Sequence, residues 1–279
     1  MAITNFIPTV WSETLYAKLN EKYVAASNCN RSFEGDIKEM GSVVKICGIE
    51  NVGLNDYHKD TDLSAPQVLT DTVIEFPIDQ AVCFNFQIDD IDLAQASPKL
   101  MEAAMSTAAA ALANQADRFI YSLHKDTETR ICLNEPTPEV LLDTFITAMQ
   151  KLYEAGVTDP SDVVIELTPY VASILLRAKI EFTSSNNSVL ENGQFGTLFG
   201  AKVFVSNNVE SFQETDDILH NCLVRTKRSI AFAEQLSEIE AYRPEKRFAD
   251  AVKGLHLFGA KVIYPKEMVC IEVTHSVAN

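Results

Sequence analysis

Five histidines are the first side chains in this 279-residue sequence to consider for chemistry. They do not fall into HExxH or any other spacing that gathers metal ligands. A lone histidine is more often a surface residue or a hydrogen-bonded core residue than a catalyst. We therefore assign no catalytic or metal-binding role to any of them: His58, His124, His220, His256 and His275.

Six cysteines are the next candidates, and no two of them lie close enough to form a CxxC pair. Scattered single cysteines in a chain of this size indicate reduced, mostly buried thiols rather than a disulfide framework. The chain is therefore expected to be made in a reducing compartment. The cysteines are Cys29, Cys47, Cys83, Cys132, Cys222 and Cys270.

Two further patterns suggest ligand binding only weakly. Asp89, Asp90 and Asp92 could offer oxygens to Mg²⁺ or Ca²⁺, but no EF-hand spacing surrounds them, and a solvated turn before a helix explains them as well. The glycine-rich run Gly193–Gly200 lacks GxGxxG, and a strand rather than a helix follows it, so a flexible turn is expected. With no GxSxG motif either, the sequence predicts no catalytic, cofactor-binding or metal-ligating residue.

The charge balance excludes some partners. The chain carries 39 Asp and Glu against 23 Lys and Arg, a net charge of −16. So acidic a chain repels phosphate backbones and anionic membranes. The most apolar run, Ala103–Ala113, is too short to cross a bilayer. A soluble globular protein is expected from 47% hydrophobic and 22% charged residues.

Two short basic runs stand out against this acidity. A charge run usually marks a solvated face, and the alternative is a surface for an acidic partner. The runs are Arg225, Lys227 and Arg228, and then Arg243, Lys246 and Arg247.

The N-terminal segment predicts a short amphipathic helix. Trp11, Leu15, Leu19 and Tyr23 recur every four residues, which places them on one apolar stripe. That stripe must dock on an apolar surface.

An acidic projection is predicted between Glu34 and Gln80. Val43–Ile46 and Val73–Phe76 are typical of two β-arms, joined by the polar stretch Asn51–Thr70. Three bases against ten acids give this segment a net charge of −7. A two-stranded projection buries too little surface to be stable on its own, so we expect it to lie on another copy of the chain.

The middle of the chain predicts a strand and then a long helix. Apolar and polar residues alternate through Val82–Ile88, as in a half-buried strand. Ser97 is a good N-cap and Pro98 suits the first helical position. Apolar residues then recur every three or four positions, so one helix of roughly 40 Å is predicted from Ser97 to about Lys125.

The remainder alternates between helix and strand. Helices are predicted over Thr137–Gly156 and Thr168–Lys179, with the buried strand Val163–Leu167 between them and the loose loop Ser184–Gly200 after them. The other predicted strands are Val203–Val205, Leu223–Arg225, Ile230–Ala233, Val252–Phe258, Val262–Tyr264 and Val269–Val273.

The hexapeptide LFGAKV occurs twice, at Leu198–Val203 and at Leu257–Val262. The flanking residues do not match, so the chain is not a repeat protein. We expect a turn leading into a strand at both places, with Gly200 and Gly259 in the turns.

The order of these segments resembles that of the major capsid proteins of tailed bacteriophages, which share the Hong Kong 97-type fold. The resemblance covers essentially the whole chain and rests on the order of its segments. The segments that carry it are Phe6–Ser12, Phe33–Lys38, Gly41–Ile46, Leu69–Thr72, Phe84–Asp92, Ser97–Lys125, Val163–Leu167, Pro169–Lys179, Gly193–Ser206, Glu240–Phe248 and Gly254–Pro265.

The resemblance implies an α+β, Hong Kong 97-like capsid fold with an N-terminal arm, an extended β-hairpin called the E-loop, and a long spine helix. It assigns residues 1–33 to the N-terminal arm and 34–80 to the E-loop. Residues 81–136 and 226–279 would form the peripheral (P) domain, with the spine helix over about 97–125, and residues 137–225 the axial (A) domain.

The implied function is structural. A major capsid protein self-assembles into homo-hexamers and homo-pentamers that form an icosahedral virion shell, assembled in the cytoplasm of the host bacterium. The shell encloses double-stranded DNA without sequence-specific binding and does not involve a membrane. The implied partners are a portal protein, a separate scaffolding protein (because the arm begins almost at Met1) and decoration proteins; no cofactor is implied.

The resemblance also suggests where copies of the chain meet, because in the family the E-loop lies over the P-domain of a neighbour. The acidic E-loop is then expected near a basic surface of that neighbour, and the alternative is that these bases pair within their own chain, with Glu240 or Glu245. The residues expected at the assembly interface are Trp11, Asp60, Asp62, Arg243, Lys246 and Arg247.

Two other functions remain open from the sequence. An encapsulin-like nanocompartment resembles the same fold but holds protein cargo, and an N-terminal helix that docks cargo would favour it. An α/β enzyme is the third class, and the lack of converging nucleophile, base and metal residues opposes it.

Overall fold

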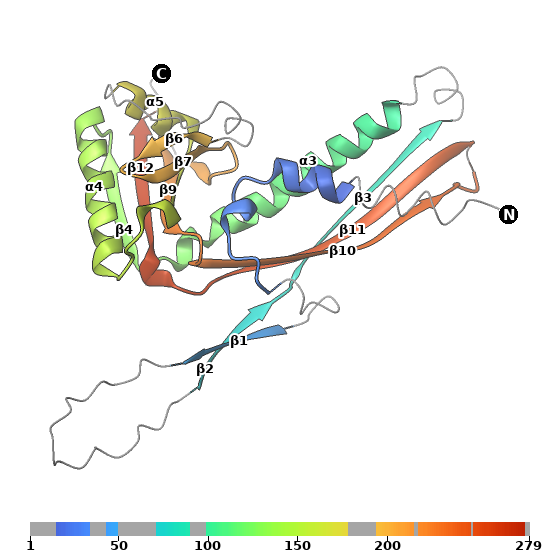
Figure 1. Ribbon diagram of the computed structural model, residues 1–279. Helices are drawn as coiled ribbons and strands as arrows, with labels where there is room; N and C mark the ends of the chain where they lie inside the picture. The colour runs from blue at the N-terminus through green and yellow to red at the C-terminus, as the bar shows by residue number, and fades with distance from the viewer. Residues whose placement is uncertain are drawn as a thin grey trace, which may run out of the picture.

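The computed structural model describes residues 15–33, 43–49, 71–89, 99–177, 194–214, 217–246 and 248–276. These ranges form an α+β structure whose elements build a seven-stranded sheet, a three-stranded sheet and a two-stranded hairpin (Figure 1). The predicted α+β class is therefore confirmed.

The seven-stranded sheet has apolar cores on both of its faces. In strand β9 (Asp217–Thr226), Cys222 and Val224 pack with the helices on one face, while Leu223 packs on the other. A strand that is buried on both faces has no exposed side, and all five residues of β5 (Val163–Leu167) are buried, the charged Glu166 included. The strand order is β4 (Thr129–Asn134), β12 (Met268–Ser276), β9 (Asp217–Thr226), β5 (Val163–Leu167), β7 (Ala201–Val205) and β6 (Gln194–Leu198), with β8 (Ser211–Glu214) paired to β9.

Two helices cover one face of this sheet (Figure 1). They are α4 (Pro138–Glu154) and α5 (Pro169–Arg177), and both begin at the predicted threonine–proline pairs. Thr137 caps α4 by accepting a hydrogen bond from the amide of Val140, and Gly156 follows the helix with a φ of 96°. This conformation favours glycine, so the helix ends here as predicted.

One long helix, α3 (Lys99–Ser122), lies along the three-stranded antiparallel sheet (Figure 1). The sheet has the order β10 (Ile230–Tyr242), β11 (Ala249–Val262) and β3 (Gln80–Asp89). The predicted long helix is confirmed over residues 99–122, and a 3₁₀ turn, η3 (Leu123–Asp126), continues it. Ser97 and Pro98 lie outside the described residues. In β3 the predicted alternation is confirmed, since exposed residues alternate with half-buried ones.

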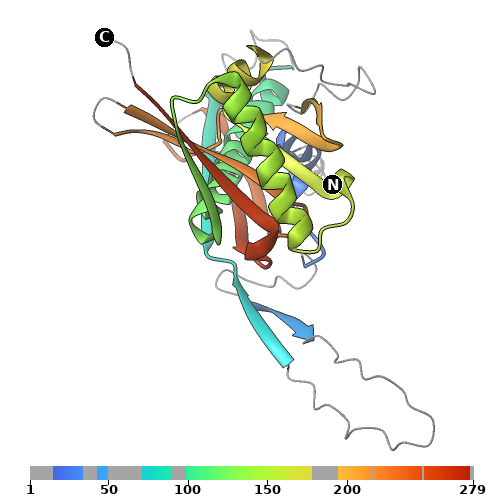
Figure 2. The same ribbon diagram turned by 90° about the vertical axis from the view of Figure 1, so that its left-hand side faces the viewer.

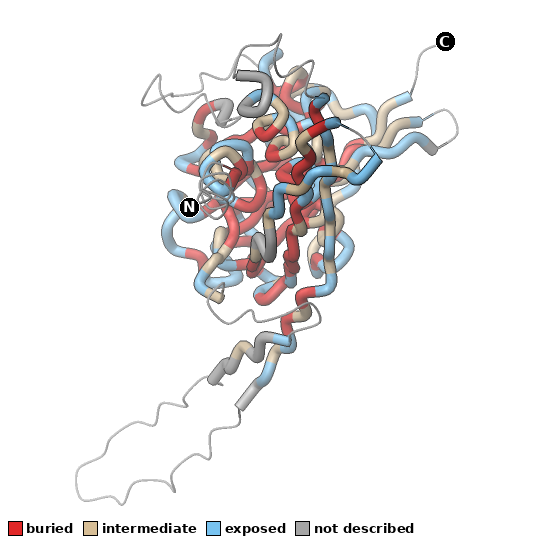
Figure 3. The backbone as a smooth tube through the Cα atoms, turned by 90° about the vertical axis from the view of Figure 1, so that its right-hand side faces the viewer, coloured by how far each residue is buried: buried red, intermediate tan, exposed pale blue. Residues whose placement is uncertain are grey.

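The hairpin of β1 (Val43–Ile49) and β2 (Asp71–Pro77) projects from the body of the subunit, as Figures 1 and 2 show. Its base is anchored, because Phe76 and Ile78 are buried against Ala231, Ala233 and Leu257 of the three-stranded sheet. Buried residues otherwise concentrate in the body (Figure 3). The predicted pair of β-arms is confirmed, and residues 50–70 lie outside the described structure.

The N-terminal helix is confirmed over residues 15–22. Leu15, Leu19 and Tyr23 of its predicted stripe are fully buried in the core under α3. Trp11 lies outside the described residues.

Two predictions for the LFGAKV segments were wrong. Gln194–Leu198 is a strand, β6, rather than part of a loose loop, because Phe199 and Gly200 (φ of 53° and 85°) form a tight turn that pairs it with β7. Gly259 is not in a turn at all. It lies inside β11, which runs unbroken to Val262, so no separate strand begins there.

Gly259 is required where the hairpin meets the body. A Cβ atom at this position would lie 2.4 Å from the carbonyl oxygen of Pro77, so β11 can pass the end of β2 this closely only without a side chain.

Gly259→Ala should therefore lower the free energy of unfolding by about 1–3 kcal/mol, the usual range for overpacking, as measured by urea denaturation. Gly254→Ala is the matched control in the same strand. There the added methyl would meet the ring of Phe84, which can rotate, so a smaller loss is expected. Equal stability of Gly259→Ala and the native chain would contradict the close-approach explanation.

Candidate functional site

The segment after the N-terminal helix is held by a buried carboxylate. Asp117 of α3 is 1% exposed and accepts hydrogen bonds from the backbone amides of Val24, Ala25 and Ala26 at 3.0–3.1 Å. Burial raises the pKa of Asp117 to about 7, although the three amide donors lower it in part. These amides have no strand partner, so Asp117 supplies the hydrogen bonds that a buried backbone needs.

The carbonyl oxygens of the same segment are bound by a buried ion pair. Arg225 of β9 donates two hydrogen bonds of 2.8 Å to Glu166 of β5, and both side chains are fully buried. The Arg225 guanidinium also donates to the carbonyl oxygens of Asn28 and Ala25 at 2.9 and 3.4 Å. One guanidinium therefore satisfies both the buried carboxylate and the backbone.

A second buried network fixes the two ends of this segment to the three-stranded sheet. Glu234 of β10 accepts hydrogen bonds from Tyr23 and Arg31, and His256 of β11 lies 2.8 Å from the same carboxylate. The Arg31 guanidinium also lies 5.8 Å from the ring centroids of Tyr23 and Phe232. The N-terminal segment is thus tied to both sheets.

The first basic run is only in part the solvated face that the sequence suggested, since Arg228 is exposed but Arg225 is not. Arg225 is fully buried, because the alternation of β9 turns it toward the N-terminal segment. Arg228 pairs with Glu267 at 2.5 Å, next to Thr226, which donates to the same carboxylate. The sequence did contain a signal, since a charged residue inside an apolar run usually has a buried partner, and Glu166 lies inside Val163–Leu167.

The second basic run lies at the tip between β10 and β11, where Arg243 and Lys246 are exposed. Arg243 pairs with Asp250 at 3.3 Å, and Glu240 pairs with Lys253 at 2.7 Å. Arg243 therefore pairs within its own chain, as the alternative expected, but with Asp250 rather than with Glu240 or Glu245. Four of the expected interface residues lie outside the described ranges: Trp11, Asp60, Asp62 and Arg247.

The histidines take structural positions where the structure describes them. His220 and His275 lie 3.1 Å apart and stack with Tyr170. Burial, and then the neighbouring His275, lowers the pKa of His220 to about 4. His124 is buried beside Glu210 at 2.9 Å, and His58 falls outside the described residues.

The cysteines are free thiols where they are described. Cys29, Cys222 and Cys270 are buried, and burial raises the pKa of each to about 12. They are therefore protonated and unreactive at neutral pH. Cys83 and Cys132 are exposed.

The described ranges contain no group of three His, Cys, Asp or Glu side chains that could hold a metal ion. Asp89 is exposed at the end of β3, and Asp90 and Asp92 lie outside those ranges. Among the same residues, no helix is long and apolar enough to span a membrane.

Comparison with solved structures identifies phage capsids. A structure of Mycobacterium phage Che8 matches with a TM-score of 0.68 and 28% sequence identity, covering 90% of this chain and 91% of that one. The capsid of Cyanophage P-SCSP1u matches with a TM-score of 0.67 and 14% identity, over 89% and 86% of the two chains. No protein-family profile and no curated protein matches the chain.

A virus-like particle from Pyrococcus furiosus has the same fold, with a TM-score of 0.58 and 11% identity over 95% of this chain and 99% of that one. The predicted resemblance to tailed-phage major capsid proteins is confirmed by these matches.

The buried carboxylate under the N-terminal segment makes a pH dependence testable. Asp117 has a pKa near 7 in the folded chain against 3.8 ordinarily, so the folded state binds its proton more tightly. This group alone should therefore reduce stability as the pH rises from about 4 to 7, by up to about 1.4 kcal/mol per pH unit. The difference in free energy of unfolding between the native chain and Asp117→Asn should fall over this window in urea denaturation series. A difference that is constant or rises with pH would contradict the assignment.

Proposed function

We propose that this chain, which has the fold of phage capsid proteins, is the major capsid protein of a tailed bacteriophage. It assembles into hexamers and pentamers that form an icosahedral head around double-stranded DNA. The observation that carries the proposal is the capsid fold over nine tenths of the chain. The proposed role is structural rather than enzymatic, which the match to capsid structures supports.

The parts of the fold receive the following roles under this proposal. The hairpin β1–β2 and residues 34–80 form the E-loop, and α3 is the spine helix of the P-domain. The sheet covered by α4 and α5 forms the A-domain. The strands β4 and β12 lie within the P-domain ranges of the chain but pair inside this sheet, so they join the two domains.

The acidity of the chain suits a container for DNA. With a net charge of −16, the subunit offers little attraction to phosphates. Packed DNA can then fill the shell without binding to its wall. A portal protein, a scaffolding protein and decoration proteins complete the proposed partners, and the virion is the proposed location after assembly in the host cytoplasm.

A nanocompartment shell is the second candidate, and the match to the virus-like particle favours it. That alternative would use the N-terminal helix to dock cargo. In this chain Leu15, Leu19 and Tyr23 are fully buried against the chain's own core, which leaves that stripe unavailable to cargo. This burial supports the phage proposal.

The full chain, purified after expression alone, should form closed shells or discrete rings in negative-stain microscopy. Replacing residues 50–70 with a short Gly-Ser bridge should abolish these particles. The far-ultraviolet circular dichroism should stay near native, because Phe76 and Ile78 still anchor the hairpin base. A compact native monomer would overturn the proposed function, and an unfolded deletion variant would place the loop in the subunit core. The contents of the shells, DNA or protein cargo, would distinguish a phage head from a nanocompartment.

Opposite charges are proposed to join neighbouring subunits. Arg243→Glu with Lys246→Glu should block shell formation, and Asp60→Lys with Asp62→Lys should partly restore it. Each exposed pair contributes only about 0–1 kcal/mol, but every subunit repeats the contact. Molar salt, which screens such charges within a few ångströms, should weaken assembly of the native chain.

Lys151→Glu with Lys266→Glu is the control for this charge reversal. Both residues are exposed and the change in net charge is identical. If the charge-reversed variants fold but Asp60→Lys with Asp62→Lys does not restore assembly, the acidic loop contacts another surface.

A further inference from the structure

We propose that Phe248 at the β10–β11 tip is an assembly knob that inserts into an apolar groove between β3 and α3 of a second copy of the chain. This inference rests on the proposed function, which it deepens by naming one contact between subunits.

The knob is an aromatic side chain without cover in the subunit. Phe248 is 85% exposed, which is more than any other large apolar side chain among the described residues. It stands beside exposed Arg243 and Lys246. Aromatic and arginine side chains together are the typical composition of energetic centres in interfaces.

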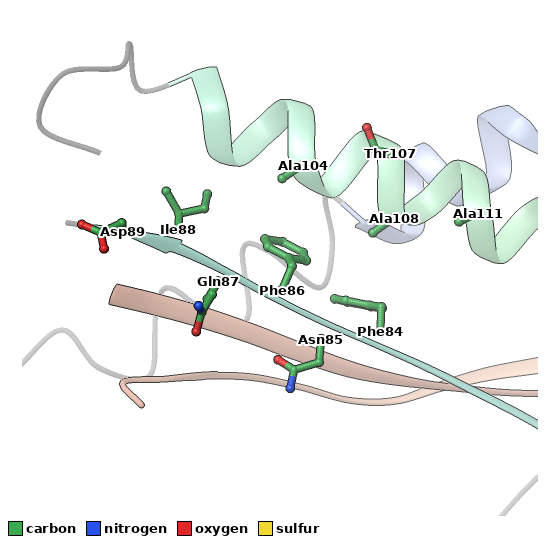
Figure 4. A pocket seen from close by; sticks show the side chains of 10 residues that line it. All are labelled: Phe84, Asn85, Phe86, Gln87, Ile88, Asp89, Ala104, Thr107, Ala108 and Ala111. Carbon is green, nitrogen blue, oxygen red and sulfur yellow. The ribbon is translucent and has the colours of Figure 1, made fainter. Parts of the chain in front are cut away.

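The groove is a hollow of about 530 Å³ along the opposite edge of the same sheet. Phe84, Phe86 and Ile88 of β3 point toward α3, while Asn85 and Gln87 point to the other side (Figure 4). The helix offers only small side chains to this hollow, which leaves it unfilled: Ala104, Thr107, Ala108 and Ala111. A hollow of this size falls in the range of about 300–1,000 Å³ that holds a small ligand.

The aromatic wall suits another ring. Phe84 and Phe86 are stacked with ring centroids 6.0 Å apart, so an entering phenyl ring meets ring faces and alanine methyl groups. Such aromatic contacts add to the simple burial of apolar area. Asp89 is exposed and lines the groove at the end of β3.

A subunit's own knob lies beside the outer end of its groove, where Asp89 pairs with Ala249, but it does not reach the inner part lined by Phe84 and Phe86. Val252 pairs with Phe86 in the sheet, and four residues of extended strand, about 13 Å, separate Val252 from Phe248. The tip would have to leave the sheet to reach back. Knob and groove also lie at the same end of the sheet, since Asp89 pairs with Ala249, the residue after Phe248. A head-to-tail contact of this kind can close by rotation into a ring.

The first test compares the protein concentration needed for assembly, by light scattering of full-length variants. Phe248→Ala and Ala108→Phe should each raise this concentration about tenfold or more, and the double variant no further than either single variant, because both remove the same contact. Phe212→Ala, an exposed phenylalanine on β8, is the control and should leave the concentration unchanged. Native-like assembly of Phe248→Ala would overturn the proposal.

The second test identifies the occupant. A photoreactive benzoylphenylalanine at position 248, in particles assembled from mixed light and ¹⁵N-labelled chains, should cross-link to residues 80–89 or 99–118 of another copy. Cross-links only to residues 1–14, only to residues 50–70, only to the same copy or to nothing would overturn the knob-and-groove contact while the proposed function stands. If the native chain forms no particles, both the proposed function and this inference fail.

Discussion

The subunit depends on the way in which two buried charges hold an N-terminal segment that has few strand partners of its own. Asp117 accepts hydrogen bonds from three of its amides, and Arg225 donates to two of its carbonyl oxygens while pairing with Glu166. Burying these charges is costly unless every partner is present. Since Asp117 belongs to α3 and Arg225 to the seven-stranded sheet, satisfying the segment also fixes the two halves of the molecule relative to one another.

This arrangement separates a well-packed body from the parts that reach outward. The seven-stranded sheet has cores on both faces, and the three-stranded sheet shares one of them with α3. The hairpin β1–β2 and the β10–β11 tip extend from that body (Figure 1). Small contacts at such projections suit assembly, because a shell repeats each of them in every subunit, whereas a rigid body keeps their geometry the same.

The titratable groups that the structure describes as buried contribute hydrogen bonds to the packing of the core. Glu234 joins Tyr23, Arg31 and His256, and the buried cysteines are protonated because burial raises their pKa to about 12. Capsids with 9–14% identity nevertheless share the fold. This agrees with a fold specified chiefly by apolar pattern and volume, for which many different side chains are suitable.

The sequence by itself determined the elements whose signals are local. Apolar periodicity and the caps at Thr137 and Gly156 predicted the helices, and alternation predicted β3, because each of these features depends on neighbours within a few residues. Their order was enough to indicate the capsid fold. Only the tertiary structure decided what depends on residues far apart in the chain. Arg225 was read as solvated because its partner Glu166 is 59 residues away, and Gly259 was read as a turn because the carbonyl of Pro77 that excludes its side chain belongs to a distant segment. The charged Glu166 within an apolar run indicates that a buried partner exists but not which residue it is. Nothing near Gly259 indicates which segment it approaches, because both contacts join segments far apart in the chain.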